Sequence, residues 1–257
     1  MKEEKLPPWT RLLPLVVLIL IVAFWAVLSH YQVFPESAFP TPRAVVQGFG
    51  EEIGAGRLFD DLVASIFRVS IGFALAVAIG VPLGLLLGHS MRARKALLPT
   101  VNFFRNLSPL AWIPFAILWF GIGDRPAIFL IFMASFFPIA LATIAAVASI
   151  PTVYFRVAEN YGYRGAELLT QVTLPAIAPQ VITALRITAG LAWVVVVAAE
   201  MIAGQDGLGF AIWDSRNSLR VDLLVVNMIV IGLIGVVIDR LLLLLTRLPS
   251  IRWGYER

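Results

Sequence analysis

The chain has 257 residues, of which 60% are hydrophobic and 14% are charged, and its mean hydropathy is +0.89. Soluble domains carry roughly 25% charged residues, so apolar surface in this excess has to face lipid. The net charge of +4 does not indicate nucleic-acid binding, because most basic residues lie on one predicted side of the membrane and do not form a single patch. The chain has no cysteine, which excludes disulfides and cysteine-ligated metal sites. Composition therefore predicts a polytopic membrane protein of one domain.

Six segments have the roughly 17–25 mostly apolar residues that a membrane-spanning helix needs. They are Leu12–Ser29, Leu62–Gly88, Leu97–Phe120, Ala127–Ala148, Val181–Ala203 and Leu223–Leu245. They predict an all-α fold with six transmembrane helices. The first has the basic flank of a signal peptide, but it is long for one and lacks a small-x-small cleavage site. We interpret it, within residues 12–30, as an uncleaved transmembrane helix.

Residues 31–61 are predicted to form an extracytoplasmic segment between the first two spans. Phe39-Pro-Thr-Pro42 cannot continue a helix, because proline lacks an amide donor and restricts the residue before it. The pattern from Val45 to Ile53 then predicts a short amphipathic helix at the membrane surface.

Basic residues indicate the orientation. With both termini cytoplasmic, five arginines lie outside and three, Arg68, Arg105 and Arg186, lie within spans. The cytoplasmic side then holds twelve: Lys2, Lys5, Arg11, Arg92, Arg94, Lys95, Arg156, Arg164, Arg240, Arg247, Arg252 and Arg257. Twelve against five fits the positive-inside rule. The polar loop 150–178 is then cytoplasmic.

This loop carries a distinctive pattern. Thr152–Tyr161 is predicted to form a short helix, Gly162 permits a turn with positive φ, and Ala166–Thr173 is predicted to form a second helix. We expect Leu174-Pro175 to close that second helix before the fifth span. A plain amphipathic connector remains the alternative interpretation from spacing alone.

The loop resembles the EAA loop of type I ABC importer permeases, and further motifs resemble the nitrate/sulfonate/taurine permease subfamily. These motifs cover residues 39–240: Phe39-Pro-Thr-Pro42, Ser65-Ile-Phe-Arg68-Val, Gly72-Phe, Gly80-Val-Pro-Leu-Gly84, Ser108-Pro-Leu-Ala-Trp112-Ile-Pro114, Trp119-Phe-Gly-Ile-Gly123, Phe137-Pro138-Ile, Ala184-Leu-Arg186, Ala198-Ala-Glu200-Met and Gly207-Leu-Gly209. The loop departs from the family at Arg156, where a glutamate is usual. The resemblance implies a permease core over residues 62–246, preceded by a cytoplasmic N-terminus (1–11) and followed by a cytoplasmic tail (247–257).

The resemblance also implies a homodimer, two cytoplasmic ATP-binding subunits, an extracytoplasmic solute-binding protein and a bacterial-type inner membrane. The residues implied to couple to the ATPase are Arg156, Ala158, Glu159, Gly162, Arg164, Leu174 and Pro175. The sequence has no G-x-x-x-x-G-K-[ST] motif to cradle nucleotide phosphates. We therefore expect no enzyme activity, metal or cofactor in this chain, with ATP and Mg²⁺ bound by the partner ATPases.

Three intramembrane charges are candidate functional residues, because a charge at mid-bilayer costs about 2.5–3.5 kcal/mol on insertion scales. At about 1.5 Å per residue, Arg105, Arg186 and Asp239 all lie about 10 Å inside the cytoplasmic boundary. Asp239 is therefore expected to pair with Arg186 or Arg105. We hypothesise an intramembrane Arg186–Asp239 ion pair, with structural glue or snorkelling as the alternatives. Arg105 would remain as a cation that favours an anion.

The third span is the candidate gate. Ser108-Pro109 and Pro114 interrupt its hydrogen bonding, and helical spacing puts Trp112 and Trp119 on one face. With Trp193 approaching from the fifth span, the hypothesised translocation path consists of Arg105, Ser108, Pro109, Trp112 and Trp193. Aromatic packing or an interfacial belt is the alternative.

Two further predictions concern structure. Glu200 is expected to form a structural tie to Arg216 or Arg220 in the following loop. Glycines 72, 80, 84 and 88 form a stripe that predicts close helix packing.

Other classes have less support. An intramembrane enzyme would need more than the lone His89 beside Ser90, and no H-E-x-x-H or paired intramembrane aspartates occur. A secondary transporter would need no docking loop and usually has broken helices in both halves. For the substrate, nitrate, bicarbonate or cyanate is favoured, while sulfonates, taurine and other organic solutes remain open.

Overall fold

The computed structural model describes residue 10 and residues 12–245, and within these residues every regular element is a helix. The predicted N-terminus (1–11) and tail (247–257) lie outside the described residues, apart from Thr10. The elements are α1 (Leu13–His30), α2 (Pro42–Gly54), α3 (Arg57–His89), α4 (Met91–Asn106), η2 (Pro109–Trp112), α5 (Ile113–Phe120), α6 (Asp124–Ala148), α7 (Thr152–Asn160), α8 (Ala166–Leu168), η3 (Leu169–Thr173), α9 (Leu174–Ala203), α10 (Leu208–Asn217) and α11 (Val221–Leu245).

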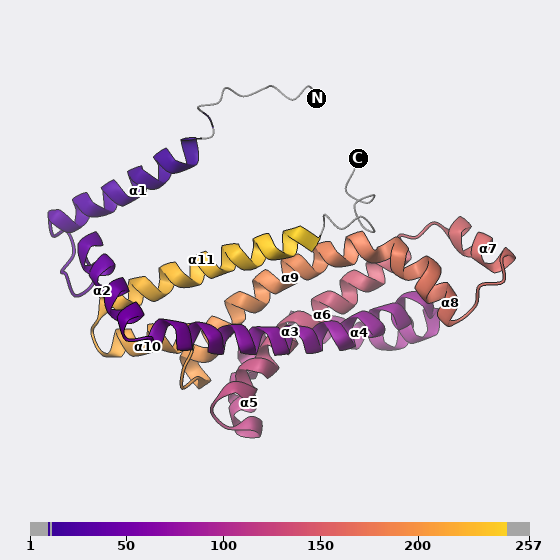
Figure 1. The fold of residues 1–257 in the computed structure, drawn as a ribbon. Coiled ribbons are helices and arrows are strands. Elements are labelled where there is room, and N and C mark those ends of the chain that lie inside the picture. Colours follow the sequence, from indigo (N-terminus) through magenta and orange to yellow (C-terminus); the bar gives the residue numbers. More distant parts are fainter. Residues whose placement is uncertain (1–9, 11, 246–257) are drawn as a thin grey trace.

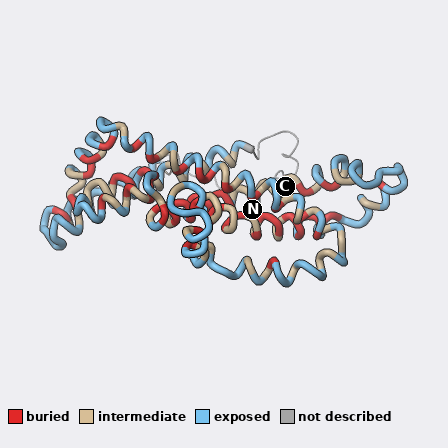
Figure 2. The backbone as a smooth tube through the Cα atoms, turned by 90° about the horizontal axis from the view of Figure 1, so that it is seen from below, coloured by how far each residue is buried: buried red, intermediate tan, exposed pale blue. Residues whose placement is uncertain are grey.

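A bundle of long helices forms the body of the protein. Figure 1 shows α3, α6, α9 and α11 running side by side, and α6 packs extensively on both α3 and α9. Buried residues concentrate along the middle of the bundle, while exposed residues predominate at its two ends (Figure 2). The helices α7 and α8 lie at one end, and α2 and α10 lie at the other (Figure 1). The predicted cytoplasmic loop and the predicted extracytoplasmic segments are therefore at opposite ends of the bundle.

The six predicted spans correspond to five continuous helices and one broken segment. Helices α1, α3, α6 and α11, and the continuous helix Ala166–Ala203, are long and apolar enough to cross a membrane. The segment predicted as Leu97–Phe120 is divided into α4, η2 and α5. Leu107 has an extended backbone, and Pro109 and Pro114, which lack amide donors, are the first residue of η2 and the second residue of α5. The third span is interrupted at the prolines that predicted a break.

The glycine stripe of α3 faces α6. A Cβ on Gly72 would lie 2.8 Å from the Ile128 carbonyl oxygen, and one on Gly84 would lie 2.5 Å from Cβ of Thr143. A Cβ on Gly88 would meet Val147 at 2.7 Å. The absence of side chains at these positions lets the two helices approach closely, which is the predicted packing role.

The N-terminal elements pack unequally on the bundle. Thr41 caps α2 by accepting a hydrogen bond from the Ala44 amide, and Val45 and Gly48 are buried, with α2 packed against α11 and α3. This confirms the short helix predicted for Val45–Ile53. Helix α1, in contrast, projects away from the bundle, and its apolar side chains are exposed almost throughout (Figure 1). In a membrane, lipid or a protein partner covers that surface.

Candidate functional site

The polar loop between α6 and α9 contains the predicted helix and glycine turn. Helix α7 follows Pro151, and at its end the Tyr161 amide donates a hydrogen bond to the Val157 carbonyl at 3.1 Å. Gly162 has φ of +82°, a conformation that L side chains rarely adopt. The Tyr163 amide then donates a hydrogen bond to the Ala158 carbonyl at 3.0 Å. These bonds satisfy the last carbonyls of α7 and fix the direction in which the chain leaves it.

The second part of the loop differs from the prediction. Leu174-Pro175 does not close a separate helix, because residues 166–203 run as one helix through a wide π-turn at Leu169–Thr173. Pro175 has no amide hydrogen to donate to the carbonyl one turn before it. We attribute the wide turn to this missing donor, since it relaxes the hydrogen-bond ladder just ahead of the proline. The loop is therefore joined rigidly to α9.

Large apolar side chains point outward from this loop. Val153, Tyr154 and Val157 are 57%, 57% and 47% exposed, and Tyr161 is 80% exposed. The charged candidates Arg156, Glu159 and Arg164 are also exposed, whereas Ala158 is buried. Beside α7 lies a cavity of about 630 Å³ whose lining includes Ala158 and Pro175. An aromatic surface mixed with charges at the end of a bundle has the composition of a protein contact surface.

His89 anchors this loop to the end of α3. One ring nitrogen lies 2.9 Å from the Leu85 carbonyl oxygen, and the other lies 3.1 Å from Oγ1 of Thr173 in the π-turn. The ring also meets Phe155 of α7 edge to face, with centroids 5.9 Å apart. The histidine considered for a hydrolase thus holds α3, α7 and η3 together.

The candidate path residues of the third segment cluster at its break. Arg105 is exposed on the last turn of α4 and forms no ion pair with a described residue, and Ser108 and Pro109 lie in the break. The rings of Trp112 and Trp119 are 6.2 Å apart, and both approach Phe129 of α6. The two tryptophans therefore share a face, as their spacing predicts.

Trp193 does not join this cluster. Its indole NH donates to the Ile231 carbonyl of α11 at 3.0 Å, and Gly235 lies against the same ring. The side chain is buried among Val196, Val226 and their neighbours, whereas Trp112 packs on a different group of buried residues. The expectation that Trp193 approaches Trp112 is wrong in this chain, because α11 satisfies and covers the indole.

Arg186 and Asp239 form the hypothesised ion pair between α9 and α11. Arg186 donates from Nε and Nη2 to the two carboxylate oxygens, at 2.7 and 2.8 Å. Bidentate geometry of this kind is the strongest form of the Arg–carboxylate contact. Asp239 therefore pairs with Arg186 and not with Arg105.

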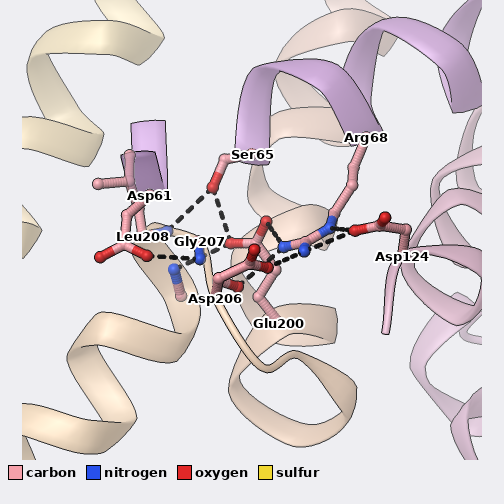
Figure 3. A network of polar contacts seen from close by, with 9 residues as sticks. Asp61, Ser65, Arg68, Asp124, Glu200, Asp206, Gly207 and Leu208 are labelled. Carbon is pink, nitrogen blue, oxygen red and sulfur yellow. Dashed lines mark hydrogen bonds and ion pairs between the residues drawn. The ribbon is translucent and has the colours of Figure 1, made fainter. Parts of the chain in front are cut away.

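A buried polar cluster joins four elements near the opposite end of the bundle (Figure 3). Arg68 of α3 donates from Nη1 to Glu200 of α9 at 2.8 Å and to the Asp206 carbonyl at 2.8 Å. Its Nε donates to Asp124 of α6 at 2.7 Å, and Nη2 contacts the Asp206 carboxylate. Ser65 donates to Glu200 at 2.9 Å.

Glu200 therefore has a different partner from the two predicted. Arg220 instead donates to Asp222 and to Glu51, and these hydrogen bonds raise the pKa of Arg220 above its ordinary value. Helix α3 begins at Arg57, five residues before the predicted span Leu62–Gly88. The first turns of α3 contain charged residues, so hydropathy does not identify this start of the helix.

The same cluster caps α10. The amides of Gly207, Leu208 and Gly209 donate to Asp61, Ser65 and Glu200 at 2.7, 3.0 and 3.0 Å. Carboxylates are favoured at this positive end of a helix. A Cβ at residue 207 would lie 2.5 Å from the Glu200 carboxyl carbon, and one at residue 209 would lie 2.3 Å from the Val197 carbonyl oxygen. Only glycine fits at both positions, which explains the Gly207-Leu-Gly209 motif. Among described residues no group of histidines and carboxylates is arranged to hold a metal ion.

Residues 80–249 match the family described as the binding-protein-dependent transport system inner membrane component. The chain is 39% identical to a putative ABC transporter permease protein of Methanocaldococcus jannaschii, over 86% of this chain and 84% of that protein. It is 33% identical to the taurine transport system permease protein TauC of Escherichia coli, over 86% of this chain and 82% of that protein. It is 35% identical to the nitrate import permease protein NrtB of Leptolyngbya laminosa, over 86% and 83%.

Among solved structures, a bacterial alginate ABC transporter in complex with an alginate-bound periplasmic protein shares the fold. The TM-score is 0.63 at 16% identity, over 93% of this chain and 96% of that one. The helical bundle and its relatives define the class as an ABC importer permease subunit. The chain belongs to the binding-protein-dependent transport system inner membrane component family.

Proposed function

We propose that this permease forms a homodimer in a bacterial-type inner membrane, with both termini cytoplasmic, and translocates a small anion of the nitrate, bicarbonate or cyanate type. Two cytoplasmic ATPase subunits bind ATP and Mg²⁺, and an extracytoplasmic solute-binding protein delivers the anion. The permease itself catalyses no reaction.

The observation that carries the coupling role is the exposed loop at one end of the bundle. Tyr154, Val157 and Tyr161 expose apolar surface where the predicted orientation places water, so a protein partner would bury it. The turn after α7 is closed by the hydrogen bond from the Tyr163 amide to the Ala158 carbonyl, and it leads into the continuous helix Ala166–Ala203 of the bundle. A push on α7 from an ATPase would therefore reach α9 as a rigid displacement.

The preference for an anion rests on Arg105. Its side chain is exposed beside the broken segment and is not neutralised by a described carboxylate. A cation at the wall of an aqueous path lowers the energy of an anion within it. A sulfonate such as taurine is the second candidate, supported by the 33% identity to TauC. Uptake of labelled nitrate, bicarbonate and taurine through the same complex would distinguish the two candidates.

Replacement of Gly162 tests the coupling role. We expect Gly162→Val to let the complex assemble and hydrolyse ATP, while uptake falls about tenfold or more, because a side chain at positive φ costs about 1–2 kcal/mol and redirects the turn. The measurement is ATP hydrolysis and solute uptake in the same vesicles.

The matched control is Gly50→Val, at an exposed helical glycine of α2 with open space around it. It should leave uptake per ATP unchanged. Normal coupling in the Gly162 variant would refute the assignment of the loop as the docking element.

A further inference from the structure

The buried polar cluster has one half sealed from solvent and another half open to it. The side chains of Arg68 and Glu200 are 1% and 0% exposed, whereas those of Asp124 and Asp206 are 53% and 59% exposed. Breaking a buried pair leaves an uncompensated charge, but exposed pairs contribute little and their groups are readily solvated after separation. The Arg68–Glu200 contact is therefore permanent, and the contacts to the two exposed aspartates can be released.

The sealed half makes α3, α9 and the start of α10 one rigid body. Glu200 accepts from Arg68 and Ser65 of α3 and from the Gly209 amide of α10. The Asp61 carboxylate of α3 accepts a hydrogen bond from the Gly207 amide, so the turn that contains Asp206 is also fixed to α3. Figure 3 shows these side chains converging from the helices on either side of the turn.

The Asp124 contact reaches a different part of the molecule. Asp124 is the first residue of α6 and follows a joint in which Gly121 and Gly123 have φ of +78° and +125°, with open space around both. The Gly123 amide also connects this joint to the end of α9, because it donates to the Ala203 carbonyl at 3.1 Å. Ahead of the joint lies α5, whose Trp119 and Leu118 are exposed. Arg68 therefore contacts two segments at once. It binds Asp124 beside the glycine joint and Asp206 in the fixed turn before α10.

We propose that the Asp124–Arg68–Asp206 bridge is a latch that holds the α5–α6 joint against the α9–α10 turn and opens when the permease admits solute from the extracytoplasmic side. Arg68 acts as a positioning residue and does not touch solute. The proposal rests on the proposed function, since ATP-driven alternation supplies the movement. Release exposes two carboxylates that water already reaches, while Arg68 keeps Glu200 and the Asp206 carbonyl as partners.

A reversible cross-link tests the latch, because the natural chain has no cysteine. The paired variant Asp124→Cys with Asp206→Cys is assembled with the ATPase and solute-binding subunits that co-purify with the chain, in lipid vesicles. Uncross-linked, it should hydrolyse ATP without the solute-binding protein roughly two- to tenfold faster than the unmodified complex, because the ion pairs from Arg68 to the two exposed aspartates are lost. Bridging the two cysteines with a bis-methanethiosulfonate, which forms a disulfide with each thiol and releases methanesulfinate, should stop uptake, and reduction of the disulfides should restore it.

The matched control is Arg57→Cys with Asp214→Cys, which replaces the exposed 2.5 Å pair between α3 and α10. Both positions belong to the rigid body, so bridging them should leave uptake intact. Uptake that persists in the bridged 124/206 variant overturns the latch, as does unchanged dependence of ATP hydrolysis on the solute-binding protein when the variant is uncross-linked. Absence of ATP-driven uptake in the unmodified complex would instead refute the proposed function, and the latch with it.

Discussion

At the scale of single residues, Arg105 and Arg186 are basic side chains predicted at the same depth, and their surroundings differ. Arg186 is held by both oxygens of Asp239, while Arg105 projects from the end of α4 without an ion-pair partner among the described residues. An arginine that is paired with a carboxylate contributes little electrostatic potential beyond the pair, whereas an unpaired arginine attracts an anion that passes near it. The two arginines therefore have different expected roles, one structural and one along the path.

Arg105→Ala should reduce anion uptake about tenfold or more without loss of the assembled complex, because the attraction of a focused charge is removed. Arg105→Lys should retain most uptake, since the charge remains. Arg92→Ala, at an exposed arginine on the first turn of α4, serves as the control and should transport normally. Uptake by Arg105→Ala equal to that of the control would exclude Arg105 from the path. Initial rates of labelled nitrate uptake make the comparison.

The sequence predicted least well which side chains contact one another. Ser65, Arg68, Glu200 and the glycines of 207–209 all stood in separate motifs, and nothing in their spacing says that they meet. Their contact depends on how α3 packs against α9 and on the path of the turn before α10, which hydropathy does not predict. The same limit applies to Trp193, whose NH is taken by a carbonyl of α11 that no pattern identifies.

At the scale of helices, the closest packing is between α3 and α6, where glycine replaces side chains along one stripe. The positions nearest to α6, Gly72, Gly84 and Gly88, have no room for a methyl group. Small-residue spacing was sufficient to predict a closely packed face on α3, although it did not identify α6 as the partner. Length, hydropathy and residue spacing were insufficient for the loop, because the π-turn before Pro175 results from a missing hydrogen bond and leaves no composition signal.

Gly84→Ala should destabilise the helix pair by about 1–3 kcal/mol, because the added methyl would lie 2.5 Å from Cβ of Thr143. The purified protein in detergent should therefore unfold at a lower temperature. Gly232→Ala, in α11 with no atom near the added methyl, should unfold no earlier than the unmodified protein. Equal unfolding temperatures for the two variants would show that α3 and α6 are not held at this distance.

At the scale of the whole molecule, the two ends of the bundle carry different surfaces. One end presents α7 with its exposed tyrosines, and the other presents α2, α10 and the exposed carboxylates of the latch (Figure 1). The apolar face of α1 also lies open. Basic-residue counts predict which of the two ends faces the cytoplasm, and that orientation stays a prediction. The identity of the partners depends on surfaces of other chains, so no feature of one chain fixes it.

The central claim is that this chain is the passive membrane half of an ATP-driven importer. The most direct test is to purify it from its native membrane and identify what co-purifies by mass spectrometry, with and without Tyr154→Asp and Val157→Asp to disrupt the exposed face of α7. The account predicts an ATPase bound to the unmodified chain and lost from the variant, and a solute-binding protein that binds nitrate, bicarbonate or cyanate. A stable oligomer of this chain alone, with neither partner, would contradict it.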